Sequence, residues 1–126
     1  SDFLTNYHQH VTERAEQGIV PLALDADQTA QLIELLKKPA DNNTEELMSL
    51  FTTRIPAGVD DATYVKASFL SAIVAGDESS PLISQTEAIK ILGTMQGGYN
   101  IEPLVNALDN DALAPTAVEA LSHTLL

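Results

Sequence analysis

The sequence predicts an all-α protein of about seven helices in antiparallel pairs. Apolar residues recur at helical spacing in seven segments, and cap residues, glycines or prolines separate each segment from the next. The composition also favours helices, because 44% of the residues are hydrophobic but only three are Phe, three are Tyr and none is Trp. Residues 1–126 are therefore expected to form a single helical domain.

The first helix is expected to begin at Ser1, which can cap it, and to end before Gly18. Its apolar face consists of Phe3, Leu4, Tyr7, Val11 and Ala15. Residues 19–24 then form a short apolar connection that Pro21 interrupts. No other segment offers a strand that could pair with it, so we expect a loop.

The second and third helices have recognisable ends. Asp25 and Gln28 make an approximate capping box for the second, and Pro39 terminates it. Asn43 is expected to start the third, which ends before Pro56.

The fourth helix has the best-specified start. Asp60 is the expected N-cap, and Val59 and Tyr64 occupy the N′ and N4 positions of a hydrophobic staple. Gly76 is expected to end this helix.

The last three helices follow the same logic. Ser84 and Glu87 match the full S-x-x-E capping-box motif at the start of the fifth helix. Asn100 begins a short sixth helix that runs to about Leu108, and Pro115 lies in the first turn of the seventh.

Three helical hairpins thus start near Asp25, Asp60 and Asn100, about 35 and 40 residues apart. Helix pairs repeated at such a period indicate a HEAT-like or related α-solenoid. No sharp repeat consensus is visible, so periodicity alone supports only paired helices.

The joint between the fifth and sixth helices has an unusual amino-acid sequence, LGTMQGGYN at residues 92–100. Gly97 and Gly98 supply the positive φ that a sharp reversal needs, and Asn100 can accept an orphan N–H of the next helix. The simplest interpretation is turn geometry, with Met95 and Tyr99 as core anchors. The alternative is a corner that binds an anion or docks a neighbouring domain, formed by Gly97, Gly98, Tyr99 and Asn100.

The net charge of −12 comes from 18 acidic and six basic residues. Many of the acids fall where helices begin, where they complement the helix dipole, so capping and solubility explain them better than a dedicated acidic docking surface. Six scattered basic residues do not form the stripe that nucleic-acid binding requires.

No catalytic, metal-binding or cofactor-binding residue is assigned. His8 and His10 lie two positions apart, so on a helix they cannot share one ion and are expected to be exposed. His123 is expected to be a satisfied interfacial histidine, because no nucleophile or carboxylate partner is identifiable. Residues 109–111 lack the ligands that a calcium loop needs further along the chain.

The chain contains no cysteine, which excludes disulfides, thiol catalysis and thiolate-held clusters within it. No membrane helix or signal peptide is visible, so we expect a cytoplasmic protein. Leu125 and Leu126 end the chain inside an apolar helical pattern without a stop signal. We therefore expect a fragment of a longer polypeptide.

The joint, LGTMQGGYN, closely resembles a segment in the N-terminal domain of the aconitase B family, the bifunctional aconitate hydratases B and 2-methylisocitrate dehydratases. The resemblance covers almost the whole chain and includes residues 10–15, 32–37, 64–70 and 120–126. It implies a HEAT-like fold. It also implies a parent enzyme of the citric acid cycle that interconverts citrate and isocitrate through cis-aconitate.

In that family a four-iron four-sulfur cluster, held by three cysteines of later domains, binds the substrate. No position of this chain matches those cysteines, so the resemblance transfers no catalytic residue. It implies instead a non-catalytic interaction or regulatory domain with the downstream catalytic domains as partners. A homodimer and an mRNA-binding side role are also implied, although the charge of −12 argues against RNA contact by this piece alone.

Two alternatives belong to other classes. A free-standing helical-repeat adaptor would have no enzyme attached, and independent activity of this piece would appear as citrate turnover, which we expect to be absent.

Overall fold

The computed structural model describes residues 2–58, 60–96 and 98–125, and this part contains seven α-helices. The helices are α1 (Asp2–Glu16), α2 (Ala26–Lys37), α3 (Thr44–Thr53), α4 (Asp61–Ala75), α5 (Gln85–Gly93), α6 (Ile101–Ala107) and α7 (Ala114–Leu125). Among the described residues the one β pairing is an isolated bridge between Ser80 and Ile83. The predicted all-α class is confirmed.

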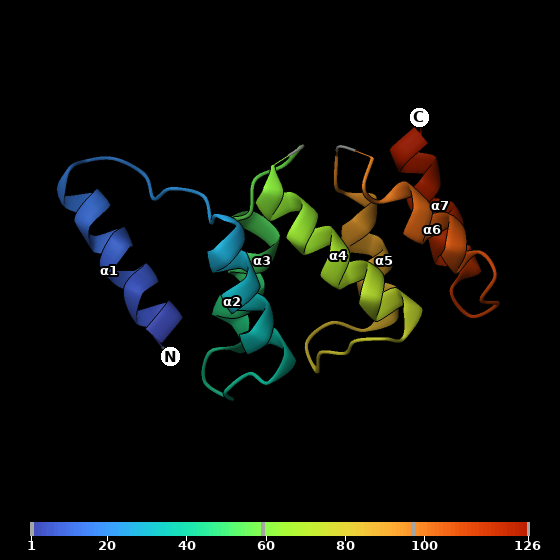
Figure 1. The fold of residues 1–126 in the computed structure, drawn as a ribbon, viewed down its shortest axis with the longest axis horizontal. Coiled ribbons are helices and arrows are strands. Elements are labelled where there is room, and N and C mark those ends of the chain that lie inside the picture. The colour runs from blue at the N-terminus through green and yellow to red at the C-terminus, as the bar shows by residue number, and fades with distance from the viewer. Residues whose placement is uncertain (1, 59, 97, 126) are drawn as a thin grey trace.

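The helices form three successive hairpins, α2–α3, α4–α5 and α6–α7, arranged side by side along the molecule (Figure 1). Helix α4 packs against both α2 and α6, so these three form one layer. Helix α5 packs against α4 and α7, in a second layer behind the first. This arrangement agrees with the predicted helical repeat.

Two of the expected helix starts form as their sequences indicate. Asp25 accepts from the backbone N–H of Gln28 at 2.8 Å, and the Gln28 side chain accepts from the backbone N–H of Asp25 at 3.0 Å, which completes a capping box. The side chain of Asp60 accepts from the backbone N–H of Ala62 at 2.9 Å. Local chemistry fixes these two starts.

One other expectation at a helix start fails, and a second falls partly outside the described residues. Ser84 accepts from the backbone N–H of Glu87 at 3.1 Å, but the carboxylate of Glu87 lies 3.9 Å from Lys90 Nζ, so only half of the predicted box is formed. The predicted staple falls partly outside the described residues, because Val59 is not among them. Its other member, Tyr64, is 58% exposed.

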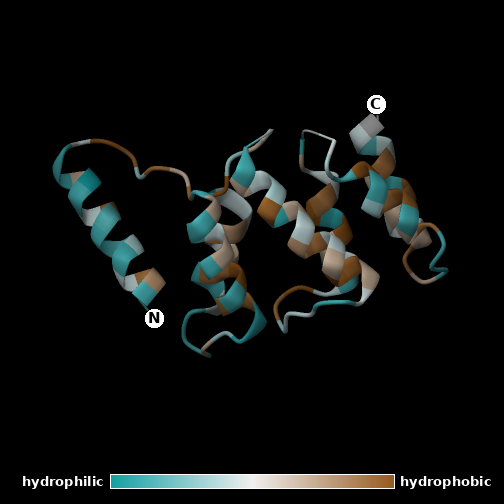
Figure 2. Cartoon of the chain, viewed as in Figure 1, coloured by the Kyte–Doolittle hydropathy of each residue, from teal (hydrophilic) through white to brown (hydrophobic). Residues whose placement is uncertain are grey.

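The core runs continuously through the array, and its largest fully buried side chains are aliphatic apart from Phe51, Asn100 and Thr29. Helix α1 is mostly hydrophilic and joins this core at one end of the molecule, whereas the connection after it is hydrophobic (Figure 2). The side chains that α1 buries are Phe3, Leu4 and Tyr7.

The connection after α1 is an extended loop, as predicted, and hydrogen bonds hold it. Arg14 Nε donates to the carbonyl of Val20 at 2.9 Å, and the backbone N–H of Leu24 donates to the carbonyl of Arg54 at 2.9 Å. The loop is thereby attached to α1 at one end and to the end of α3 at the other.

One charged side chain lies inside the array. Lys66 of α4 is 7% exposed, and its Nζ lies 5.3 Å from the centroid of the Phe51 ring. Among the described residues no carboxylate forms an ion pair with it. Burial therefore lowers the pKa of Lys66 from its usual 10.5, because the charged form loses hydration.

We expect Lys66→Met to raise the free energy of unfolding at neutral pH by about 1 kcal/mol, since Met keeps the volume and removes a buried unpaired charge. Between the lowered native pKa and the usual 10.5, the unfolded chain binds more protons than the native one. The stability of the unsubstituted protein should therefore rise with pH across that window, and this rise should disappear in the variant.

Urea titrations at several pH values measure both effects. The matched control is Lys90→Met, whose side chain is 62% exposed and should change the stability by no more than about 0.5 kcal/mol. A loss of stability in Lys66→Met would show instead that the contact with Phe51 outweighs the cost of burial.

Candidate docking corner and groove

The joint between α5 and α6 turns on a left-handed glycine. Gly98 has a φ of +81°, which L side chains rarely adopt, as the sequence predicted for this position. Gly97, its predicted companion, lies outside the described residues. Pro103 is in the first turn of α6, where its missing N–H costs nothing.

Asn100 does not cap α6, and this prediction was wrong. Its side chain makes no cap hydrogen bond and is instead buried, with 1% exposure. Its Nδ2 donates to the carbonyls of Leu92 at 2.7 Å and Met95 at 3.2 Å, and lies 3.4 Å from Thr124 Oγ1. The Leu92 carbonyl at the end of α5 also accepts from the backbone N–H of Met95 at 3.1 Å, and the carboxamide adds a further donor to it and to the Met95 carbonyl. Asn100 therefore ties the end of α5 and the turn to α7.

A second close contact supports the same corner. A Cβ placed on Gly93, the last residue of α5, would lie 2.9 Å from Ala120 Cβ and 3.3 Å from Ala120 Cα. Real Cβ atoms do not approach another carbon so closely. The backbones of α5 and α7 can therefore cross at this distance only because residue 93 has no side chain.

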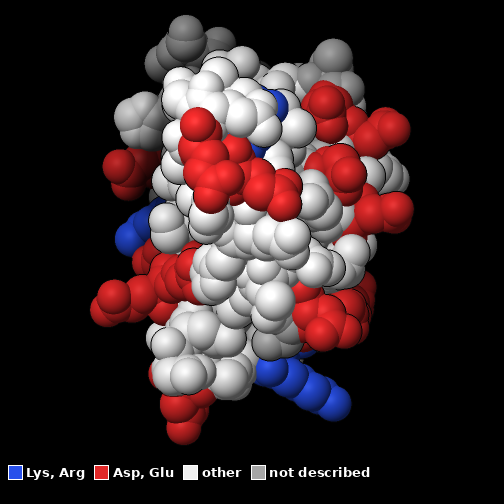
Figure 3. Space-filling view, turned by 90° about the vertical axis from the view of Figure 1, so that its left-hand side faces the viewer, with Lys and Arg blue, Asp and Glu red and all other residues white. Residues whose placement is uncertain are grey.

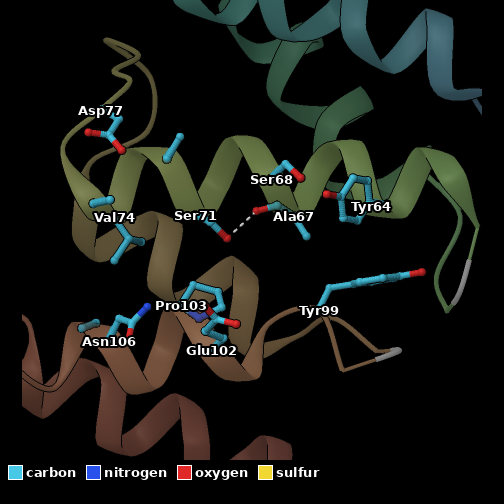
Figure 4. A pocket seen from close by; sticks show the side chains of 13 residues that line it. Tyr64, Ala67, Ser68, Ser71, Val74, Asp77, Tyr99, Glu102, Pro103 and Asn106 are labelled. Carbon is cyan, nitrogen blue, oxygen red and sulfur yellow. Dashed lines mark hydrogen bonds between the residues drawn. The ribbon is translucent and has the colours of Figure 1, made fainter.

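The two predicted core anchors at the joint are half-buried and pack against the core from its edge; they are Met95 and Tyr99. The ring of Tyr99 also packs edge-on against Tyr64 of α4, with centroids 5.6 Å apart and an interplanar angle of 69°. This aromatic pair stands at one end of a groove between α4 and α6 (Figure 4).

The groove has a volume of about 470 Å³ and is open to solvent. On the α4 side small residues line it, among them Ala67, Ser68 and Ser71, and on the α6 side Glu102 and Asn106 do (Figure 4). Asp77 lies at the end remote from the tyrosines. None of its described lining residues is a lysine, arginine or histidine.

The N-terminal histidines connect elements and do not form a metal site. His8 is exposed, as predicted, and its Nε2 lies 2.7 Å from a carboxylate oxygen of Glu46, which links α1 to α3. Nε2 of His10 accepts from the backbone N–H of Leu22 at 2.9 Å. The described part of the chain contains no group of three metal-ligating side chains.

His123 is not the satisfied interfacial residue that the sequence suggested. It is exposed on α7 and lines a second groove, of about 510 Å³, opposite Lys90 of α5. It follows Ala120 by one helical turn on the same side of α7, but at the solvent-exposed rim of this groove. Residues 109–111, which briefly suggested calcium, form a turn in which the side chain of Asn110 accepts from the backbone N–H of Ala112 at 3.0 Å.

Carboxylates are spread around the N-terminal end of the molecule, with few lysines and arginines between them (Figure 3). This face has no continuous basic stripe of the kind that nucleic acids require. In the described residues no helix is long and apolar enough to cross a membrane.

Comparison with known proteins decides the family. The family model described as the aconitate B N-terminal domain matches residues 6–126. The chain belongs to this family.

Relatives of this aconitase B N-terminal domain include aconitate hydratase B of Salmonella typhimurium (strain LT2), 59% identical over 123 residues, and that of Escherichia coli (strain K12), 58% identical over 123 residues. Each alignment covers 98% of this chain and 14% of the relative. Aconitate hydratase B of Helicobacter pylori (strain J99) is 40% identical over 127 residues, which cover 99% of this chain and 15% of the relative. The chain thus spans about one seventh of the length of these curated relatives.

The aconitase B N-terminal domain also has an apolar face that the sequence did not reveal as exposed. Two residues of α6, its C-cap residue and one residue of α7 remain between 37% and 57% exposed, namely Ile101, Val105, Leu108 and Val118. The sequence predicts an apolar set of Ile101, Leu104, Val105 and Leu108 for this helix, and of these the structure buries only Leu104, together with Ala107. The four lie on the flank of the last hairpin that faces away from α4 and α5, hereafter the open-end face. The groove had no comparable sequence signal, because it depends on how α4 meets α6.

We expect Asn100→Ala in the aconitase B N-terminal domain to lower the free energy of unfolding by about 2–3 kcal/mol, because the carbonyls of Leu92 and Met95 lose their hydrogen bonds from the buried amide. Asn100→Asp keeps the shape but loses the same donors, so it should be no better at neutral pH and should recover partly at low pH, where the acid can donate. Urea titration monitored by circular dichroism measures both.

The control is Asn106→Ala on the same helix, which is exposed and should cost no more than about 0.5 kcal/mol. A loss from Asn100→Ala as small as that of the control would refute the structural role of the amide.

Proposed function

We propose that this chain is the non-catalytic N-terminal interaction domain of an aconitase B-type hydro-lyase, a cytoplasmic enzyme of the citric acid cycle. The parent enzyme interconverts citrate and isocitrate through cis-aconitate and also dehydrates 2-methylisocitrate. The observation that supports this most directly is the family match over residues 6–126, combined with relatives of which the chain covers only 14%.

The side chains of this domain do not suit the parent enzyme's cofactor. A four-iron four-sulfur cluster of this family needs cysteine thiolates, and the chain contains no cysteine. No reaction step is therefore derived for these residues, and the cluster belongs to other parts of the parent protein.

The open-end face supports a permanent contact with the remaining domains of the same polypeptide. Its four aliphatic side chains are exposed on the last hairpin, and surfaces of obligate contacts are apolar in this way. On the opposite flank the same two helices pack against α4 and α5, so a further element would continue the existing stacking. The predicted corner contributes less, because Asn100 is buried, but Tyr99 remains available to a partner.

As a second part of this proposal, the parent enzyme forms a homodimer through a surface of this domain that its other domains do not cover. Contact with mRNA by this domain alone is not proposed, because six basic residues against 18 acidic ones would repel phosphates.

The proposal is tested with three purified proteins: the full-length enzyme, its Val105→Asp variant and residues 1–126 alone. After incubation with iron and sulfide, formation of cis-aconitate from citrate is followed by ultraviolet absorbance. We expect turnover by both full-length proteins and none by residues 1–126. Citrate turnover by residues 1–126 would contradict the non-catalytic role.

The docking role is tested on the same full-length proteins by limited proteolysis. Val105→Asp places a charge on the open-end face and should speed release of the N-terminal domain severalfold. The control is Val20→Asp, whose site is 75% exposed in the loop after α1, and it should leave the release rate unchanged. Equal release rates for both variants would remove the open-end face from the proposal.

A further inference from the structure

The groove between α4 and α6 differs in chemistry from the open-end face. It is lined by carboxylates, hydroxyls, an amide and two phenol rings over a floor of small side chains, whereas the open-end face is aliphatic. The two surfaces lie on opposite flanks of α6. An aliphatic surface suits permanent packing, and a small polar groove suits a partner that binds and leaves.

The groove selects for positive charge. Asp77 and Glu102 line it, and among the described residues neither carboxylate forms an ion pair, in contrast to Glu34 and Glu78, which both pair with Lys37. No described cation neutralises the groove from within, and the whole chain carries −12. A bound cation would therefore meet two uncompensated carboxylates in a partly desolvated setting.

The two tyrosines add a site for a flat or compact cation. Tyr64 is 58% exposed, and its edge-on contact with Tyr99 leaves ring surface facing the groove (Figure 4). Aromatic faces attract guanidinium and ammonium groups, and arginine stacks on them most often. Glu102, on the opposite wall, lies between the tyrosines and Asp77 (Figure 4).

The shape fits a polypeptide segment. From Tyr64 to Val74 the α4 wall rises by about 15 Å, which corresponds to roughly three helical turns. The α4 wall carries the small side chains of Ala67, Ser68 and Ser71, so the backbone of a bound segment can approach α4 closely. The groove is open along its length, which suits the side of a helix better than an enclosed small molecule.

We propose that the α4–α6 groove binds a helical segment of a separate protein that carries arginine or lysine, with its cation held between the Tyr64–Tyr99 pair and Glu102. This proposal rests on the interaction role proposed above and specifies the partner's chemistry. Because the contact is small and charged, binding is weak, rapid and sensitive to salt.

The test uses the full-length enzyme and a fluorescein-labelled alanine-based peptide of about 15 residues with arginines at positions i, i+4 and i+7. Fluorescence anisotropy measures its dissociation constant, and a peptide with glutamines at those positions serves as reference. We expect binding of the arginine peptide only, and loss of that binding as the ionic strength rises from about 0.01 M to about 1 M.

Variants of the enzyme locate the site. Tyr64→Ala and Glu102→Gln should each weaken binding about fivefold or more, and both sites are exposed, so folding is preserved. The matched control is Glu119→Gln, which removes the same charge from the groove between α5 and α7 and should change binding less than twofold.

Three results would overturn the proposal. Equal weakening by Glu119→Gln would mean that the peptide responds to the overall negative charge. Equal binding of the glutamine peptide would remove the cation from recognition. Failure of the arginine peptide to bind, together with protection of Tyr64 from nitration by tetranitromethane, would show that the parent's own chain fills the groove. None of these results bears on citrate turnover by residues 1–126, so the two proposals fail separately.

Discussion

The close crossing of α5 and α7 is the constraint on which the rest of this structure depends. Gly93 lets the two backbones meet at a distance that leaves no room for a Cβ beside Ala120. That approach brings Thr124 near the Asn100 amide, which also holds the end of α5. Helix α6 is thereby fixed between α4 and α7, and its two flanks become the wall of the groove and part of the open-end face. Both candidate surfaces follow from one contact.

The sequence could predict what local chemistry determines. The capping box at Asp25 and the left-handed turn at Gly98 each depend on a few adjacent residues, and both are confirmed. The roles of Asn100, Tyr64 and His123 could not be predicted, because each depends on a helix distant in the sequence. An asparagine before a helix usually caps it through its side-chain oxygen, but here Nδ2 donates to the carbonyls of Leu92 and Met95, and the buried Oδ1 reaches no backbone N–H of α6. The groove likewise exists only where α4 meets α6.

The unusual sequence of the joint between α5 and α6 has a structural explanation. Gly93 is required by packing, Gly98 by a φ of +81°, and Asn100 by its hydrogen bonds to the carbonyls of Leu92 and Met95, so the described conformation needs no ligand. The aconitase B N-terminal domain has two exposed surfaces of different chemistry. The aliphatic face suits a lasting contact, and the acidic aromatic groove suits a transient one.

A double-mutant cycle on Gly93→Ala and Ala120→Gly tests the central constraint most directly. Alanine at position 93 should lower the free energy of unfolding by about 1–3 kcal/mol although alanine favours helices by about 1 kcal/mol over glycine. Ala120→Gly should relieve this loss, so that the two substitutions couple favourably by at least about 1 kcal/mol. If the changes in unfolding free energy of the two single variants add to that of the double variant within about 0.5 kcal/mol, the close crossing is contradicted. The structural explanation of the joint between α5 and α6 would then be contradicted as well.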